Sequence, residues 1–166
     1  MEDSQSDVYE RLINAALRFV SFRMRSEREI RDFLAGKLSR SHTSAPDVLE
    51  HAIERLTELG YVNDHEFAVW WVGTRMGRKP KGPRAVRSEL SQKGVAADII
   101  DTVLSTLMKG ENSELALARA AGAKKAAGLV GYPKMEQKQK LASFLQRRGF
   151  SSGVVWSVVD DMVENV

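Results

Sequence analysis

Two segments of this chain, 55 residues apart, share a pattern of apolar side chains that ends in a glycine. Val86, Leu90 and Gly94 correspond to Leu141, Leu145 and Gly149. Beyond the glycines, at the same spacing, Ile99, Ile100, Val103, Leu104 and Leu107 pair with Val154, Val155, Val158, Val159 and Met162. A register kept over more than 20 residues indicates a duplicated unit. Duplicated units usually bind extended partners rather than catalyse reactions.

A third, fainter copy of the pattern lies upstream. Ile30 and Leu34 precede their counterparts in the next copy by 56 residues, whereas the segment 47–56 precedes its counterpart by 51. The first copy therefore has five more residues in its polar connection, 40–46, where a surface loop can accept them.

Apolar spacings of three and four dominate the chain, and strict alternation is almost absent, which predicts an all-α protein. Each copy holds three predicted helices. We therefore expect three tandem three-helix repeats, similar to helix-turn-helix units, in an elongated and curved array. The expected boundaries are a flexible N-terminus at 1–8 and repeats at 9–61, 62–109 and 110–166.

Helix start and stop signals support this division. The capping-box pattern of Ser26 with Glu29 starts one helix, Ser44 and Pro46 start the next, and Asn63 starts a third. Glycines stop several helices, because only glycine readily adopts a positive φ angle. The nine expected helices run from Val8 to Met24, Ser26 to Leu38, Pro46 to Gly60, Asp64 to Arg75, Pro83 to Gly94, Ala97 to Met108, Ser113 to Ala127, Lys134 to Arg148, and from Ser151 or Ser152 onward.

Charge is distributed unevenly along the chain. The net charge is only +3, but residues 75–93 hold seven basic side chains and one acid, and residues 119–148 hold eight and one. Solvated helix faces would give such segments too. Because the two segments occupy corresponding parts of two repeats, they favour one continuous strip that faces a polyanion or an acidic partner.

The composition limits the class of protein and the cellular location that we expect. A hydrophobic content of 43% suffices for a continuous core, and no apolar run approaches the roughly 20 residues of a membrane span. The polar, acidic start lacks the features of a signal peptide. We expect a cytoplasmic monomer that does not contact membranes, and the absence of cysteine excludes thiolate chemistry and cysteine-ligated zinc.

No group of residues predicts catalysis. His42, His51 and His65 lack the spacing of a helical metal pair, so surface positions are favoured. The segment from Gly122 to Gly128 lacks the Gly-Lys-Ser/Thr ending of a phosphate loop and falls within a helical pattern. Adjacent Asp160 and Asp161 do not converge on one substrate. We expect no enzyme activity, cofactor or metal.

The aromatic residues are expected to pack rather than to stack on bases. Trp70 and Trp71 point about 100° apart on a helix, so one can enter a core while the other covers a junction between repeats. Phe67, Phe144 and Phe150 occupy core positions of the helical pattern.

Three motifs in order resemble the RecX family of recombination regulators. They are Ser26-x-x-Glu29-Ile30 with Leu34, Leu59-Gly60-Tyr61-Val62-Asn63-Asp64 with Phe67 and Ala68, and Lys81-Gly82-Pro83 with Val86, Glu89, Leu90 and Lys93-Gly94-Val95. The resemblance covers about residues 10–164. Asn63 stands where the family commonly has aspartate, and the alanine-rich segment 116–127 replaces a bulkier stripe.

The resemblance implies a modulator without enzyme activity that binds RecA and its filament on single-stranded DNA. It implies suppression of ATPase and strand-exchange activities, and so of recombination and the SOS response. A direct helix-turn-helix-type binder of single- or double-stranded DNA is one alternative, and a structural adaptor is another. The residues expected to bind the partner or phosphates are Arg23, Arg25, Arg28, Arg75, Arg78, Lys79, Lys81, Arg84, Arg87, Lys93, Lys124, Lys125, Lys134, Lys138, Lys140, Arg147 and Arg148.

Overall fold

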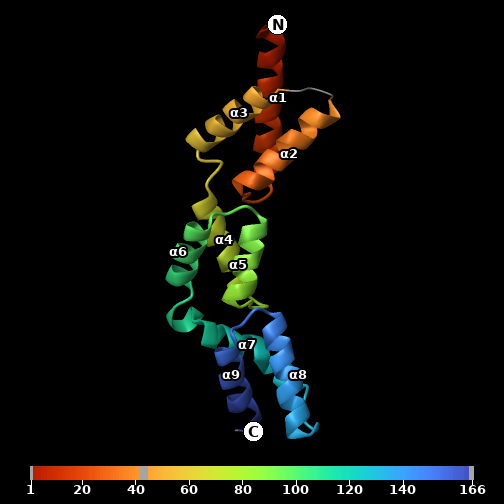
Figure 1. The fold of residues 1–166 in the computed structure, drawn as a ribbon, viewed down its shortest axis with the longest axis vertical. Helices are drawn as coiled ribbons and strands as arrows, with labels where there is room; N and C mark the ends of the chain where they lie inside the picture. Colours follow the sequence, from red (N-terminus) through yellow and green to blue (C-terminus); the bar gives the residue numbers. More distant parts are fainter. Residues whose placement is uncertain (1, 42–44, 165–166) are drawn as a thin grey trace.

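The helices of this protein form three stacked groups of three. The structure is a computed structural model that describes residues 2–41 and 45–164. Those residues form nine α-helices and one short 3₁₀ helix, and they include no strand. Figure 1 shows the groups arranged along the long axis of the molecule, with the chain ends at opposite ends. The predicted all-α array of three-helix repeats, elongated and curved, is confirmed.

Unit 1 comprises α1 (Glu2–Ser21), α2 (Glu27–Arg40) and α3 (Pro46–Glu58) around a core of buried aliphatic side chains. The helix α1 begins six residues earlier than expected, so residues 2–8, expected to be flexible, are helical. The Ser26 capping box is confirmed, whereas Ser44 lies outside the described residues and Ala45 is the N-cap of α3.

Unit 2 comprises α4 (Asp64–Met76), α5 (Pro83–Gln92) and α6 (Ala97–Leu107). Its core is built on Phe67, Val72, Leu90 and Ile100, each of which is almost fully buried. The side chain of Asn63 accepts a hydrogen bond from the Glu66 amide at 3.1 Å, which is the expected N-cap of α4. The amide oxygen of asparagine thus replaces the more common carboxylate without loss of the cap.

Unit 3 comprises the short 3₁₀ helix η1 (Gly110–Asn112), then α7 (Glu114–Ala127), α8 (Lys134–Arg147) and α9 (Ser152–Glu164). Its alanine-rich helix α7 packs very closely on its neighbours. A Cβ at buried Gly122 would lie 3.3 Å from Met162 Sδ and 3.5 Å from Leu141 Cδ1. Small residues in α7 therefore serve close helix packing, and the segment from Gly122 is part of a helix rather than a phosphate loop.

The units join through their middle helices, α2, α5 and α8, which follow one another down the molecule in Figure 1. The carbonyl of Lys93, just after α5, accepts a hydrogen bond from the Ser26 hydroxyl at 2.7 Å. The carbonyl of Arg148, just after α8, accepts one from the Gly82 amide at 2.8 Å. The end of α5 thus contacts the start of α2, and the end of α8 contacts the start of α5.

The glycines of the repeated pattern lie at these junctions. Gly94 and Gly149 both have a φ angle of +84°, and Gly60 has +77°, so the predicted left-handed conformation is confirmed at all three. Apolar side chains add to the junctions: Met24 packs on the core of unit 2, and Met76 and Met108 pack on the cores of units 2 and 3. None of the helices within 2–41 and 45–164 is long and apolar enough to cross a membrane.

Candidate partner-binding surface

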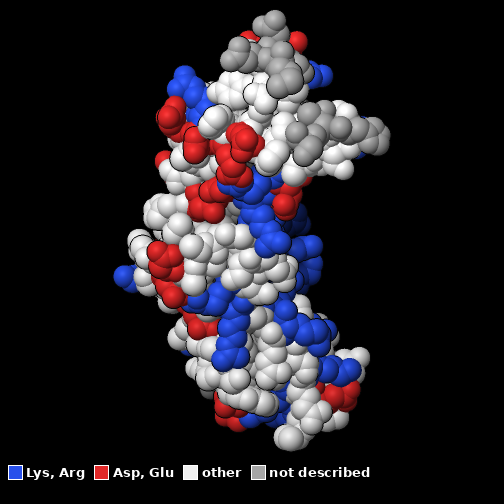
Figure 2. Space-filling view, turned by 45° about the horizontal axis from the view of Figure 1, so that its top comes forward, with Lys and Arg blue, Asp and Glu red and all other residues white. Residues whose placement is uncertain are grey.

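Basic side chains gather on one face of the array. Figure 2 shows Lys and Arg in a band over the middle and lower parts of the molecule, with most Asp and Glu toward its flanks. The connection between α4 and α5 contributes Arg78, Lys79 and Lys81, and its course is fixed where the Lys81 amide donates to the Arg75 carbonyl at 3.0 Å. The expected basic residues fall into three groups according to the contacts that they make.

The first group neutralises a carboxylate inside unit 2. Glu89 accepts hydrogen bonds from Arg75 Nε at 2.6 Å and from Trp71 Nε1 at 2.8 Å, and it forms an ion pair with Lys81. Burial alone would raise the pKa of Glu89, but the hydrogen bonds from Lys81, Arg75 and Trp71 lower it overall. Arg75 also lies 4.1 Å from the centroid of the Trp71 ring. Arg75 and Lys81 therefore stabilise the fold with the same charge that would attract a partner.

The other two members of the first group, Arg23 and Lys93, form a matching cluster around Glu29, where units 1 and 2 meet. Arg23 Nη2 and Lys93 Nζ approach its Oε1 atom at 2.8 and 2.9 Å, and its Oε2 atom accepts from the Ser26 amide. Burial would raise the pKa of Glu29, yet the hydrogen bonds from Arg23, Lys93 and Ser26 lower it from 4.5 to about 2. The Lys93 ammonium also lies 4.4 Å from the Trp71 ring.

The tryptophans and phenylalanines pack largely as expected. Trp70 and Trp71 are half-buried and contact the core of unit 2, with Trp71 beside the junction to unit 1. Phe67 and Phe150 are almost fully buried, which confirms their core positions. Phe144 is only half-buried and lies 4.8 Å from the Arg148 guanidinium.

The second group of cations makes contacts at the surface or at a unit boundary. Arg25 covers the Phe19 ring at 3.9 Å, and Arg148 donates to the Pro80 carbonyl at 3.2 Å. The remaining members form ion pairs: Arg28 with Asp32 at 3.8 Å, Arg87 with Asp101, Lys138 with Asp160 and Glu164 at 2.8 and 2.6 Å, and Lys140 with Glu136 at 3.0 Å. Exposed pairs of this kind contribute little stability, so a partner can replace them.

The third group has no carboxylate partner among the described residues. Its members are Arg78, Lys79, Arg84, Lys124, Lys125, Lys134 and Arg147. All are exposed except Lys125, which is half-buried, and all lie in units 2 and 3. Because their charges are not used within the fold, these side chains are the ones best able to contact carboxylates or phosphates of a partner.

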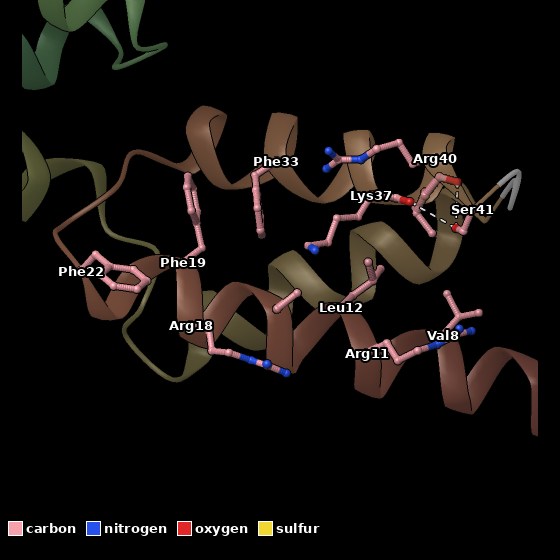
Figure 3. Close-up of a pocket in the computed structure, with 12 residues that line it drawn as sticks. Val8, Arg11, Leu12, Arg18, Phe19, Phe22, Phe33, Lys37, Arg40 and Ser41 are labelled. Carbon is pink, nitrogen blue, oxygen red and sulfur yellow. Dashed lines mark hydrogen bonds between the residues drawn. The ribbon is translucent and has the colours of Figure 1, made fainter.

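The sequence did not predict one set of cations in unit 1. Arg11, Arg18, Lys37 and Arg40 rim a groove of about 630 Å³ between α1 and α2, shown in Figure 3. Unit 1 as a whole has more acids than bases, with 11 against 9 in residues 1–60, which hid this local excess. The helical spacing of Arg11 and Arg18, which places both on one side of α1, was the only available signal.

The remaining candidates offer no catalytic arrangement. His51 and His65 are exposed on α3 and α4, and His42 lies outside the described residues. Within the described part of the chain, no three His, Asp or Glu side chains are close enough together to hold a metal ion. Asp160 pairs with Lys138, and Asp161 pairs with Arg119 at 3.2 Å, so the two carboxylates serve different contacts.

Comparison with known proteins relates this arrangement to one family. Models of the second and third three-helix domains of RecX match residues 63–104 and 112–159. The regulatory protein RecX of Chlorobium limicola is 34% identical over 148 residues, which cover 89% of this chain and 84% of that protein. The chain belongs to the RecX family. This is a family of regulatory proteins rather than of enzymes.

Other RecX proteins extend the comparison. The regulatory protein RecX of Bacillus subtilis is 32% identical over 162 residues, covering 98% of this chain but 59% of that protein, so the chain spans little more than half of this relative. The crystal structure of RecX from Lactobacillus salivarius has a TM-score of 0.81 at 24% identity, with 97% and 99% of the two chains covered. A second RecX crystal structure has a TM-score of 0.77 at 26% identity, with 98% of this chain and 76% of that chain covered.

Proposed function

We propose that this chain is a negative regulator of homologous recombination and of the SOS response, which binds RecA and its filament on single-stranded DNA. In this role it inhibits ATP hydrolysis and strand exchange by the filament. Membership of the RecX family of regulatory proteins supports the regulatory part. The observation that supports the binding part is the group of seven cations that have no described carboxylate as a partner, which lie in units 2 and 3.

The binding surface follows from the way the cations are used. Arg78, Lys79 and Arg84 surround the connection between α4 and α5, and Arg147 ends α8. A nucleoprotein filament presents phosphates and protein carboxylates at regular intervals, and arginine can pair with either in bidentate geometry. Units 2 and 3 would therefore repeat one kind of contact along the filament.

The mechanism needs no chemistry by this chain. Its three units are joined end to end by hydrogen bonds at both junctions, so the array can lie along a groove and contact adjacent RecA subunits. Holding those subunits in an arrangement unsuited to ATP hydrolysis, or occupying the groove that a second DNA strand must enter, would inhibit the filament. Such a regulator acts in the cytoplasm, as a monomer and without a cofactor.

A titration into a RecA ATPase assay on single-stranded DNA tests the proposal. We expect the purified chain to lower the rate of ATP hydrolysis in a concentration-dependent way. An unchanged rate at a large excess of the chain would contradict the proposal.

A pair of charge-reversed variants tests the surface. Arg84→Glu with Arg147→Glu should raise the concentration for half-inhibition about tenfold, since two filament contacts become repulsive. Arg55→Glu with Lys109→Glu changes the net charge equally at exposed positions outside the proposed surface, and it should inhibit normally. Equal inhibition by both variants would remove these residues from the interface.

Direct DNA binding is the second candidate, and the same unpaired cations favour it. Binding dominated by phosphate contacts loses affinity steeply with salt, because each contact releases counterions. Tight, sequence-selective binding to duplex DNA without RecA, measured by fluorescence anisotropy over a range of salt concentrations, would support this alternative instead.

A further inference from the structure

The groove between α1 and α2 is the most distinctive surface of unit 1. Its floor is apolar and includes Leu12, Ala15 and Phe19 of α1 with Phe33 and Leu38 of α2. Phe22 lies at one end and is 84% exposed (Figure 3). The groove extends along α1 from Val8 to Phe22, which is about 20 Å at the rise of an α-helix. An exposed apolar surface of this kind marks an interaction site.

The charged side chains that line this groove are cationic among the described residues. They are Arg11, Arg18, Lys37 and Arg40, and no described Asp or Glu lines it. None of the four forms an ion pair with a described carboxylate. By contrast, the other arginines of unit 1 that contact carboxylates are Arg23, Arg28, Arg31 and Arg55. The fold thus separates the arginines that pair with carboxylates from four cations that line one groove.

The corresponding position in unit 2 holds a charged cluster. The residue that corresponds to Phe33 is Glu89, 56 positions later. Its carboxylate accepts a hydrogen bond from Trp71 and forms ion pairs with Arg75 and Lys81. In unit 3 the corresponding residue is Phe144, whose ring is approached by Arg148. The charged cluster around Glu89 thus replaces, in unit 2, the Phe33 ring that lies on the floor of the groove in unit 1, whereas unit 3 keeps an aromatic ring with a cation beside it.

The phenylalanine rings favour a protein over a nucleic acid as the occupant. Phe19 and Phe33 stack on each other with centroids 4.1 Å apart and planes 7° from parallel. Arg25 lies 3.9 Å from the Phe19 centroid, and Lys37 Nζ lies 5.2 Å from that of Phe33. Ring faces that are already covered cannot stack on bases, which is how single-stranded nucleic acids bind aromatic residues. Ring edges and aliphatic side chains suit an apolar helix face.

We propose that this groove docks an acidic amphipathic helix of a partner protein. Apolar side chains at i, i+3, i+4 and i+7 of that helix would lie on the floor, as in other helix-in-groove complexes. Acidic side chains on either flank would pair with Arg11 and Arg18 on one side and with Lys37 and Arg40 on the other. The proposal rests on unit 1 and is independent of the filament surface on units 2 and 3.

Synthetic peptides test the docking directly. The probe is a fluorescent helical peptide of about four turns, with leucine at the apolar positions and glutamate on both flanks. Anisotropy should show saturable binding to the full chain. A peptide with lysine in place of every glutamate should bind at least about tenfold more weakly, because its charges meet the cationic rim. Absence of binding, or equal binding of the two peptides, would overturn the proposal.

Variants of the groove locate the binding. Arg18→Glu with Lys37→Glu should lower the affinity for the acidic peptide about tenfold or more. Arg55→Glu with Lys109→Glu, the variant of equal net charge, should not lower it. Phe22→Ser removes an apolar contact at an exposed position and should also lower the affinity for the acidic peptide. Affinity unaffected by the groove variants would overturn the proposal.

Two further measurements separate the other occupants. Competition by a single-stranded oligonucleotide that is lost in the groove variant would assign the groove to nucleic acid. A dimer of the chain that dissociates in the groove variant, detected by light scattering, would assign it to a second copy. Either result would overturn the proposal. Neither measurement contains RecA, so the outcome does not depend on the proposed regulation of the filament.

Discussion

The two junctions between units have the same arrangement but different chemistry. At the first, side chains make the contacts: the Ser26 hydroxyl donates to Lys93, and the Lys93 ammonium pairs with Glu29. At the second, backbone groups dominate, since the amides of Gly82 and Arg84 donate to the carbonyls of Arg148 and Gly149 at 2.8 and 3.2 Å. Both place the glycine that ends one middle helix against the start of another.

This difference shows which part of the repeated pattern is constrained. A junction made by side chains tolerates more distance between helices, but it depends on charge. A junction made by backbone depends on the absence of a Cβ atom on both sides. We therefore expect substitutions of the glycines at the second junction to act mainly through steric overlap, and substitutions of Ser26 and Glu29 at the first to act through hydrogen bonds and pH.

The largest effect is expected for Gly149→Ala. A Cβ atom there would approach the nitrogen and Cβ of Ala85 closer than 3.0 Å, and the φ angle of +84° adds backbone strain. We expect a loss of about 3 kcal/mol or more in the free energy of unfolding, measured by chemical denaturation.

Gly60→Ala is the matched control for the backbone strain. Gly60 has a similar φ angle of +77°, but a Cβ atom there would have nothing within 4 Å. Its substitution should cost only about 1 to 2 kcal/mol. Equal losses in the two variants would show that the junction contact does not contribute.

The next effect concerns Gly82→Ser. The corresponding residue at the first junction is Ser26, so this variant gives the second junction the residue type of the first. Gly82 has a φ angle of −75°, so serine suffers no backbone strain. Its Cβ would nevertheless overlap the backbone carbonyl of Gly149, and we expect a loss of about 2 kcal/mol in the free energy of unfolding. Gly36→Ser, in the middle of α2 with no atom within 4 Å of the new Cβ, should not destabilise the protein. A neutral Gly82→Ser would mean that the two junctions are interchangeable.

A third prediction uses the charge at the first junction. The pKa of Glu29 is lowered to about 2, so its ionised form stabilises the folded state above pH 4.5, and this contribution is lost as the pH falls toward 2. We expect the loss to be about 2 kcal/mol, because solvent partly screens the carboxylate. Burial raises the pKa of the neighbouring Asp64, which acts in the opposite direction on acidification.

Comparison with Glu29→Gln isolates the contribution. The variant should be less stable than the parent at pH 6, and the difference should shrink as the pH falls from 4.5 to about 2, followed by denaturation at each pH. Glu136→Gln, which removes a surface pair with Lys140, should change stability by less than about 1 kcal/mol. A difference between Glu29→Gln and the parent that is independent of pH would contradict the lowered pKa.

Much of the fold could be predicted from the sequence, because helix signals are local. Apolar spacing gave the three units, and Ser26, Asn63 and Gly94 marked helix ends correctly. The end-to-end contacts could not be predicted in this way. They join residues such as Ser26 and Lys93, 67 positions apart, and a repeat pattern does not reveal which end of one unit meets which end of the next.

The basic surface was predictable as a region but not residue by residue. Charge counts cannot show that Arg75 and Lys81 converge on Glu89 while Arg78 and Lys79 contact none of the described carboxylates. Asp64 was similarly expected only at the start of its own helix, yet it accepts a hydrogen bond at 2.8 Å from the Glu27 amide of unit 1. Pairing depends on the distance between side chains after folding, and a linear sequence contains no such distances.

The smallest effect separates the two roles of Ser26. Its hydroxyl accepts from the Glu29 amide within α2 and donates to the Lys93 carbonyl of unit 2. Ser26→Ala should therefore lose both the cap and the bond between units, about 2 kcal/mol in all. Ser113→Ala removes a cap of α7 that has no partner in another unit, and it should cost about 1 kcal/mol. If thermal unfolding gave the same loss for both, the hydroxyl at the first junction would act only as a helix cap, and Lys93 with Glu29 would provide the polar connection there.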